Sequence, residues 1–204
     1  MKSNNHLVKY LVNKGILRSK EIINAFTVID RKDFVGLENL DNAYEDYALS
    51  IGYDATISQP TTVAFMLEKL GIMPGDIVLD VGTGSGWTTA LLATIVGGKG
   101  RVYGVEIVPE LVALGQYNLS KYKFSNASIE QSGEILGLPD NAPFDRILVS
   151  AGTDDLPKEL LMQLKEGGNL IIPIDASIWK VEKRHNSATT IYKYPGFIFV
   201  PLQK

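Results

Sequence analysis

A glycine-rich segment, LDVGTGSG at residues 79–86, constrains the fold more than any other part of the sequence. It overlaps a nearly continuous apolar run, DIVLDVG at 76–82, which is typical of a parallel strand covered on both faces. A helix is predicted directly after it. Glycines let the backbone approach a bound molecule because no Cβ stands in the way, and the helix N-terminus supplies a polar end. The segment therefore predicts a strand, a cofactor-binding turn and a helix.

Alternating strands and helices continue beyond this segment, which indicates an α/β fold with a doubly wound, mostly parallel sheet. The tail, 177–202, is expected to add antiparallel strands with a turn at His185-Asn186-Ser187. Helices are predicted at about 5–14, 19–28, 61–70, 87–96, 109–121 and 157–165, and strands at about 76–82, 101–107, 127–131, 144–150 and 169–174, with Gly167 and Gly168 breaking the last helix.

The length and composition are those of one globular domain. The chain has 204 residues, of which 45% are hydrophobic. We expect a single domain over 1–204 with three parts: an N-terminal helical and substrate-side segment (1–70), a cofactor-binding α/β core (71–176) and C-terminal strands (177–204).

The spacing of the glycines bears on the kind of cofactor. Gly82, Gly84 and Gly86 form G-x-G-x-G, whereas a dinucleotide fingerprint would place its third glycine at position 87, which is Trp87 here. The observed spacing resembles the first motif of S-adenosylmethionine-dependent methyltransferases. Glu106 ends the next predicted strand, where an acid can accept the hydroxyls of a ribose. S-adenosylmethionine and NAD both carry such a ribose, so Glu106 does not distinguish between these two cofactors. The glycines could also form a simple tight turn, with Glu106 as a solvated strand end.

Composition argues against several kinds of site and partner. The chain has no cysteine, and therefore no disulfide, thiolate zinc site or cysteine nucleophile. His6 and His185 lie in no metal-ligand spacing, and no Gly-x-Ser-x-Gly elbow is present, so we expect no metal and no histidine general base. A net charge of −3 argues against nucleic acid, and no signal peptide or membrane span is predicted. We expect a cytoplasmic monomer.

The segment YDATISQP at 53–60 allows two interpretations. Ser58 precedes a predicted helix with Pro60 in its first turn, which is typical of an N-cap. Alternatively, the hydroxyls of Thr56 and Ser58 could hold a polar substrate, and a capping serine would be held rigidly for that purpose. The local residues alone favour the cap.

Four segments together resemble the protein-L-isoaspartate O-methyltransferase family, over almost the whole chain. SIGYDATISQP (50–60) is similar to the family's S/P-I-G-x-x-x-T-I-S-x-P signature, and LDVGTGSGWTTALLA (79–93) to its cofactor motif. Parts of 142–174, APFDRILVSAG and LPKELLMQLKEGGNLIIPI, resemble the family's second half, and FIFVPL (197–202) its closing strand. Many methyltransferases share the glycine loop, but its combination with T-I-S-x-P and F/Y-V-P-L is far more specific.

The resemblance implies a Rossmann-like methyltransferase fold and methyl transfer from S-adenosylmethionine to the free carboxylate of L-isoaspartyl residues in damaged proteins or peptides. The ester then collapses to a succinimide, and repeated cycles restore normal aspartate. Ser58 would be the active-site hydroxyl, with Thr56 beside it. The implied cofactor site consists of Gln59, Pro60, Thr61, Thr62, Asp80, Gly82, Thr83, Gly84, Gly86, Glu106, Ile107, Gly133 and Glu134.

This chemistry agrees with the residues present. A carboxylate has a reference pKa near 4, so it is ionised at neutral pH and needs no general base. Ser58 is expected to donate a hydrogen bond to one carboxylate oxygen while the other attacks the methyl group. It would orient the substrate and would not be a nucleophile.

Some positions depart from the family pattern. Ser132-Gly133-Glu134 stands where the family has Gly-Asp-Gly, and Asp54, Asp154 and Asp155 add acids near a site meant for a carboxylate. Three alternatives stay open: another methyltransferase with a dedicated peptide, RNA or small-molecule substrate, an NAD(P) oxidoreductase, and a binding module whose catalytic site has decayed.

Overall fold

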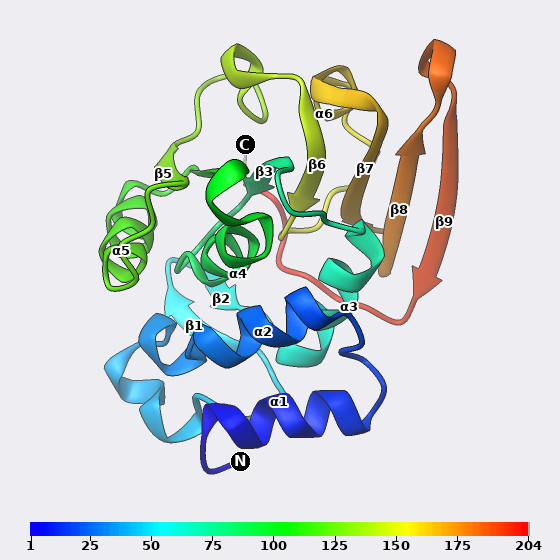
Figure 1. The fold of residues 1–204 in the computed structure, drawn as a ribbon. Helices are drawn as coiled ribbons and strands as arrows, with labels where there is room; N and C mark the ends of the chain where they lie inside the picture. Colours follow the sequence, from blue (N-terminus) through cyan, green and yellow to red (C-terminus); the bar gives the residue numbers. More distant parts are fainter. Residues whose placement is uncertain (204) are drawn as a thin grey trace.

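A computed structural model describes residues 1–203, and its centre is a seven-stranded sheet in the order β5-β4-β3-β6-β7-β8-β9 (Figure 1). The five strands from β5 to β7 in that order run parallel to one another. Strand β8 pairs antiparallel with β7, and β9 pairs antiparallel with β8. This confirms the predicted fold class. The bounds are β3 Ile77–Val81, β4 Arg101–Glu106, β5 Ala127–Gln131, β6 Phe144–Val149, β7 Leu164–Ile174, β8 Ser177–Lys183 and β9 Thr189–Pro195.

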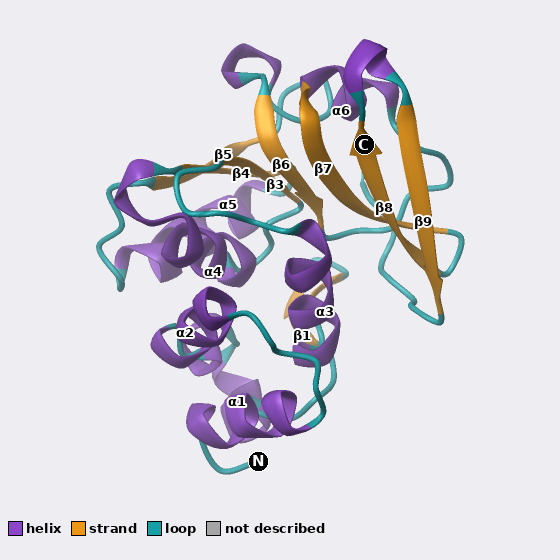
Figure 2. Cartoon of the chain, turned by 45° about the vertical axis from the view of Figure 1, so that its right-hand side comes forward, coloured by secondary structure: helices purple, strands orange, loops and turns teal. Residues whose placement is uncertain are grey.

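Helices cover both faces of the sheet, but unequally. Figure 2 shows α1 to α5 on one side and α6 on the other. Along β3, Val78 packs toward the five-helix side, while Leu79 and Val81 pack toward α6, as the period-2 alternation of a strand requires. The bounds are α1 Asn4–Asn13, α2 Lys20–Val28, α3 Pro60–Leu70, α4 Trp87–Val96, α5 Pro109–Ser120 and α6 Lys158–Gln163. No helix in the described part of the chain is both long enough and apolar enough to cross a bilayer.

Two C-terminal expectations need correction. The predicted helix at 157–165 ends at Gln163, and Gly167 and Gly168 lie inside β7 instead of breaking a helix. A Cβ on Gly168 would lie 2.8 Å from the carbonyl oxygen of Asp145, so glycine lets β7 pass close to β6 where their register shifts. Residues 197–202 form no strand. They make one parallel bridge, between Pro201 and Gly152, through the carbonyl of Val200 and the N–H of Leu202.

The segment 30–57, which shows no clear periodicity, folds into two 3₁₀ turns and a hairpin of β1 (Leu49–Gly52) and β2 (Ala55–Ile57). The hairpin turn is Tyr53–Asp54, with φ of 53° and 56°. Two left-handed residues match the twist of a tight hairpin, although Asn-Gly is the usual signal there. This hairpin brings YDATISQP toward the carboxyl ends of the parallel strands.

Candidate active site

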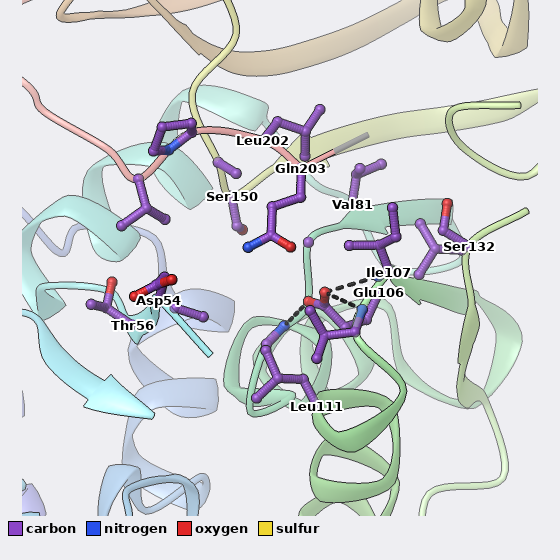
Figure 3. Close-up of a pocket in the computed structure, with 18 of the residues that line it drawn as sticks. Asp54, Thr56, Val81, Glu106, Ile107, Leu111, Ser132, Ser150, Leu202 and Gln203 are labelled. Atoms are coloured by element: carbon purple, nitrogen blue, oxygen red, sulfur yellow. Dashed lines mark hydrogen bonds between the residues drawn. The ribbon is translucent and has the colours of Figure 1, made fainter. Parts of the chain in front are cut away.

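The main cavity, of about 650 Å³, opens where the strand order reverses, between β3 and β6. Ligands of open α/β sheets bind at this kind of position, outside the carboxyl ends of the strands. Figure 3 shows Asp54 and Thr56 of the hairpin on one side and Glu106 and Ile107 of the β4 end across from them. The C-terminal residues 200–203 line the cavity as well. The site is thus assembled from the hairpin, the sheet core and the C-terminal segment.

The glycine loop forms the floor of this cavity. Gly82 and Gly84 line it and have left-handed backbones, with φ of 75° and 52°. Gly86 lines neither this cavity nor the smaller second cavity that adjoins it. A Cβ there would lie 3.1 Å from the carbonyl oxygen of Gly115, so the third glycine allows α4 to begin close to α5.

Glu106 is only 7% exposed, so it is not a solvated strand end. Its Oε2 accepts the N–H of Gly84 at 2.9 Å, and its Oε1 accepts those of Ile107 and Val108 at 2.8 and 3.2 Å. A carboxylate can accept about four hydrogen bonds, so a ribose hydroxyl can be added without losing these three. Glu106 therefore joins the glycine loop to the β4 end and still faces the cavity.

The cavity beyond Glu106 is apolar. Ile107, Val108, Leu111 and Leu136 line it, and Ser132 adds a hydroxyl. A flat aromatic base fits such walls, as we expect for adenine against Ile107. The two residues expected nearby, Gly133 and Glu134, are exposed and line neither cavity, whereas their neighbours Ser132 and Leu136 do.

Asp80 lies behind the glycine loop and is fully buried. Its Oδ2 accepts hydrogen bonds from the hydroxyls of Thr88 and Thr89, both at 2.7 Å, while Oδ1 has no partner in the described structure. Burial raises the pKa of Asp80 to about 6, the two threonine hydrogen bonds oppose the rise, and the charge of Glu106 adds to it. Asp80 thus connects the glycine loop to the first turn of α4.

A second cavity, of about 300 Å³, adjoins the first and shares Thr56, Gly82 and Ser150 with it. Hydroxyl groups dominate its wall, and none of the described residues that line it carries a charged side chain. Thr83 and Trp87 line this cavity, but the hydroxyl of Thr83 and the indole N–H of Trp87 are themselves buried and have no partner among the described residues. A cavity with several neutral donors and no cation can bind an anion without neutralising it. Its lining is Thr56, Ile57, Ser58, Gly82, Thr83, Ser85, Trp87, Thr88 and Ser150.

Ser58 lies in this second cavity and does not cap α3. The N-cap is Gln59, without a side-chain cap. Asp46 does the capping from outside the helix, because its carboxylate accepts both the N–H and the hydroxyl of Thr61, at 2.9 and 2.7 Å. The interpretation of Ser58 as a cap is therefore wrong, and its hydroxyl is left for the cavity.

Arg31 fixes the backbone at Ser58. It is fully buried, and its guanidinium donates to the carbonyl oxygens of Ala43, Tyr47 and Ser58 at 2.7, 3.0 and 3.2 Å. It also lies 5.3 Å from the ring centroid of Trp87. Burial lowers the pKa of Arg31 to about 10. This cation holds the loop in place but does not reach into the second cavity, whose lining excludes it.

Besides Asp80, Gly86, Gly133 and Glu134, four more predicted cofactor residues lie outside both cavities: Gln59, Pro60, Thr61 and Thr62. Gln59 donates to the backbone of Asp46 and accepts from Thr62, while Pro60 is buried in the first turn of α3. They support the loop of Ser58 from behind.

Residues that the sequence did not single out complete the site. Ser150 follows β6, and Ser85 and Thr88 lie around the start of α4. Their place beside the glycine loop was a usable signal, because the carboxyl ends of parallel strands meet at one edge. Arg31 and Asp46 had no such signal.

Comparison with known proteins gives one consistent family. The family model for protein-L-isoaspartate(D-aspartate) O-methyltransferase matches residues 2–204. Proteins named protein-L-isoaspartate O-methyltransferase from Methanopyrus kandleri and Pyrococcus horikoshii are each 40% identical to the chain. The matches cover 96% of it and 89% and 90% of those relatives.

Solved structures agree. A Plasmodium falciparum crystal structure, named as a protein-L-isoaspartate O-methyltransferase and solved with S-adenosyl-L-homocysteine, superposes with a TM-score of 0.88. The two sequences are 26% identical, and the superposition covers 100% of this chain and 99% of the Plasmodium falciparum chain.

Proposed function

The chain belongs to the protein-L-isoaspartate O-methyltransferase family, and from this premise we propose that it methylates the free carboxylate of L-isoaspartyl residues in damaged proteins or peptides. One observation carries the assignment of roles: a cavity that contains the glycine loop and the buried Glu106 adjoins a hydroxyl-lined cavity that contains Ser58. The methyl ester formed is the species that collapses to a succinimide, the first step back to normal aspartate.

The residues of the main cavity fit S-adenosylmethionine, the family's methyl donor. Glu106 keeps acceptor capacity for a ribose hydroxyl, Gly82 and Gly84 keep the loop free of Cβ atoms, and the apolar end suits adenine. When bound, this cofactor supplies an electrophilic methyl group on a sulfonium ion. Thr56, Gly82 and Ser150 line both cavities, so the methyl group and its acceptor can meet there.

The second cavity is proposed to hold the isoaspartyl carboxylate. Neutral hydroxyl donors such as those of Ser58 and Ser150 can orient a carboxylate without the loss of nucleophilicity that a directly paired cation would cause. One oxygen is held by Ser58 while the other takes the methyl group, and the acceptor enters ionised. No histidine lines either cavity in residues 1–203, which is compatible with a reaction that needs no base. Catalysis would then be mainly positioning in a sheltered site.

We further propose that residues 1–70 form the substrate side of a single domain, since the hairpin and Ser58 come from there. The absence of cysteine and the net charge of −3 support a cytoplasmic enzyme without nucleic-acid or membrane partners. A monomer is the proposed working state.

The test compares two peptides that differ only in isoaspartate against normal aspartate, with methyl-labelled S-adenosylmethionine. Label is expected in the isoaspartyl peptide only, and Ser58→Ala should lower kcat by about tenfold to a hundredfold because the carboxylate loses an orienting donor. Ser125→Ala, an exposed serine outside both cavities, is the matched control.

Equal labelling of both peptides would reject the isoaspartyl substrate and favour another methyltransferase activity. Binding of S-adenosylhomocysteine without labelling of any peptide would identify a decayed binding module. The family membership already removes the oxidoreductase alternative.

A further inference from the structure

A third cavity, of about 600 Å³, continues outward from the main cavity, which we call the cofactor cavity, and shares Pro201 with it. It is a groove between the loop after β6 (152–154), the β7–β8 turn (174–176) and the C-terminal segment (197–201). We call it the flanking groove. The flanking groove lies beside the reaction site. It contributes none of the residues that line the second cavity, which we call the hydroxyl cavity because hydroxyl groups dominate its wall.

Backbone hydrogen bonds hold the three walls of the flanking groove together. The N–H of Gly152 donates to the carbonyl of Val200 at 2.8 Å, and that of Thr153 to the carbonyl of Pro173 at 3.0 Å. The N–H of Phe197 donates to the carbonyl of Ala176 at 3.1 Å. The groove is therefore a built feature of the fold and not a gap between independent loops.

The flanking groove combines apolar walls with acidic rims. Pro173, Phe197 and Phe199 line it, and so do two exposed aspartates, Asp154 and Asp175. Neither carboxylate has a hydrogen bond or an ion pair with any residue in 1–203. Such a surface suits a side chain with an apolar stem and a positive head, as lysine and arginine have.

Charges around the three cavities point the same way. Among residues 1–203, the charged side chains that line them are all acidic: Asp54 and Glu106 in the cofactor cavity, Asp154 and Asp175 in the flanking groove, and none in the hydroxyl cavity. Three backbone N–H groups compensate Glu106, whereas no residue in 1–203 donates a hydrogen bond to the carboxylate of Asp54, Asp154 or Asp175. These acids repel the carboxylate of an isoaspartyl residue as it approaches. A lysine or arginine close to that residue in the substrate is attracted by the same acids and offsets the repulsion.

We propose that the flanking groove receives a lysine or arginine side chain of the substrate, from a residue within a few positions of the isoaspartyl residue. Two or three extended residues span roughly 7–10 Å, so a basic residue a few positions along the substrate can lie that far from the isoaspartyl carboxylate. This inference rests on the proposed isoaspartyl activity and adds a preference for basic sequence context. Asp154 and Asp175 determine that preference.

The test uses isoaspartyl peptides with lysine, glutamine or glutamate at each of the three positions on either side of the isoaspartyl residue. At low ionic strength, the best lysine peptide should exceed its glutamine counterpart in kcat/KM by about three- to tenfold, mainly through KM, and glutamate should fall below glutamine. The lysine advantage should shrink in 0.5 M NaCl, where exposed charges are screened.

The double variant Asp154→Asn, Asp175→Asn should lose most of the lysine-to-glutamine ratio, and Asp140→Asn, an exposed acid outside the three cavities, should keep it. Circular dichroism and a thermal melt establish that both variants are folded. Fluorescence anisotropy with the same peptides measures binding without turnover.

Equal kcat/KM for all peptides would overturn the preference, and an unchanged ratio in the double variant would overturn the assignment to this groove. Failure to methylate any isoaspartyl peptide would instead contradict the proposed function. In that case the anisotropy ratio between lysine and glutamine peptides still decides the groove.

Discussion

Two buried acids lie beside the glycine loop, Asp80 and Glu106, and their hydrogen-bond environments differ. Glu106 accepts three backbone N–H groups, which stabilise its charge. Asp80 accepts only two threonine hydroxyls, on one oxygen, and desolvation prevails, which raises its pKa to about 6. Burial thus brings the pKa of the Asp80 carboxyl close to neutral pH.

Asp80 should make the stability of the cofactor-free enzyme depend on pH. Its pKa is raised in the folded state, so its contribution to stability is present below about pH 4 and is lost as the pH rises through about 6. Asp80→Asn should therefore gain on the order of 2–3 kcal/mol relative to wild type between pH 4 and 7. Urea unfolding across that range measures the difference, with Asp140→Asn as an exposed control. Parallel curves for Asp80→Asn and wild type would contradict the buried-acid assignment.

At the scale of elements, the start of α3 is organised by a distant loop. Asp46 caps the helix through Thr61 and also accepts the hydroxyl of Tyr10, at 3.1 Å, so it links α1, the loop and α3. Arg31 fixes the same loop and the carbonyl of Ser58. Asp46 and Arg31 thus support the loop and the start of α3, and the hydroxyl of Ser58 is not needed for the helix.

Stability measurements can separate these two roles. Asp46→Ala removes the cap and should lower the free energy of unfolding by about 1–2 kcal/mol. Ser58→Ala should change it by less than about 0.5 kcal/mol, as expected for a side chain without a structural hydrogen bond, while lowering kcat. Urea unfolding of both variants checks this. A loss of stability in Ser58→Ala as large as that in Asp46→Ala would restore the capping role.

At the scale of the whole molecule, the site joins parts that are far apart in the chain. The hairpin at 49–57 supplies one wall, the sheet core the floor, and residues 200–203 a further wall (Figures 1 and 3). The C-terminal segment is anchored by two hydrogen bonds with Gly152, from Gly152 N–H to Val200 and from Leu202 N–H to Gly152, at 2.8 and 2.7 Å.

Removal of residues 200–204 should therefore weaken cofactor binding more than folding. The last strand ends at Pro195, so the sheet stays complete, but the cofactor cavity loses a wall that includes Leu202. The Kd for S-adenosylhomocysteine should rise about tenfold by calorimetry, from the lost apolar contact. Deletion of 203–204 alone keeps that contact and should have a smaller effect. An unchanged Kd after removal of 200–204 would show that this segment does not help to bind the cofactor.

Local pattern alone determined the fold class, the glycine loop and Glu106, because strand and helix periods, turn residues and the carboxyl ends of parallel strands are encoded over short stretches. Local pattern by itself left Ser58 either as a helix cap or as a substrate-binding hydroxyl, and the family resemblance favoured the second. Tertiary structure decided that Asp46 and not Ser58 caps α3, that Arg31 holds the loop of Ser58, and that Gly167 and Gly168 lie in a strand. It also placed Asp154 and Asp175 on one groove. These outcomes depend on contacts between residues tens of positions apart, which are settled when the layers pack and which no local period records.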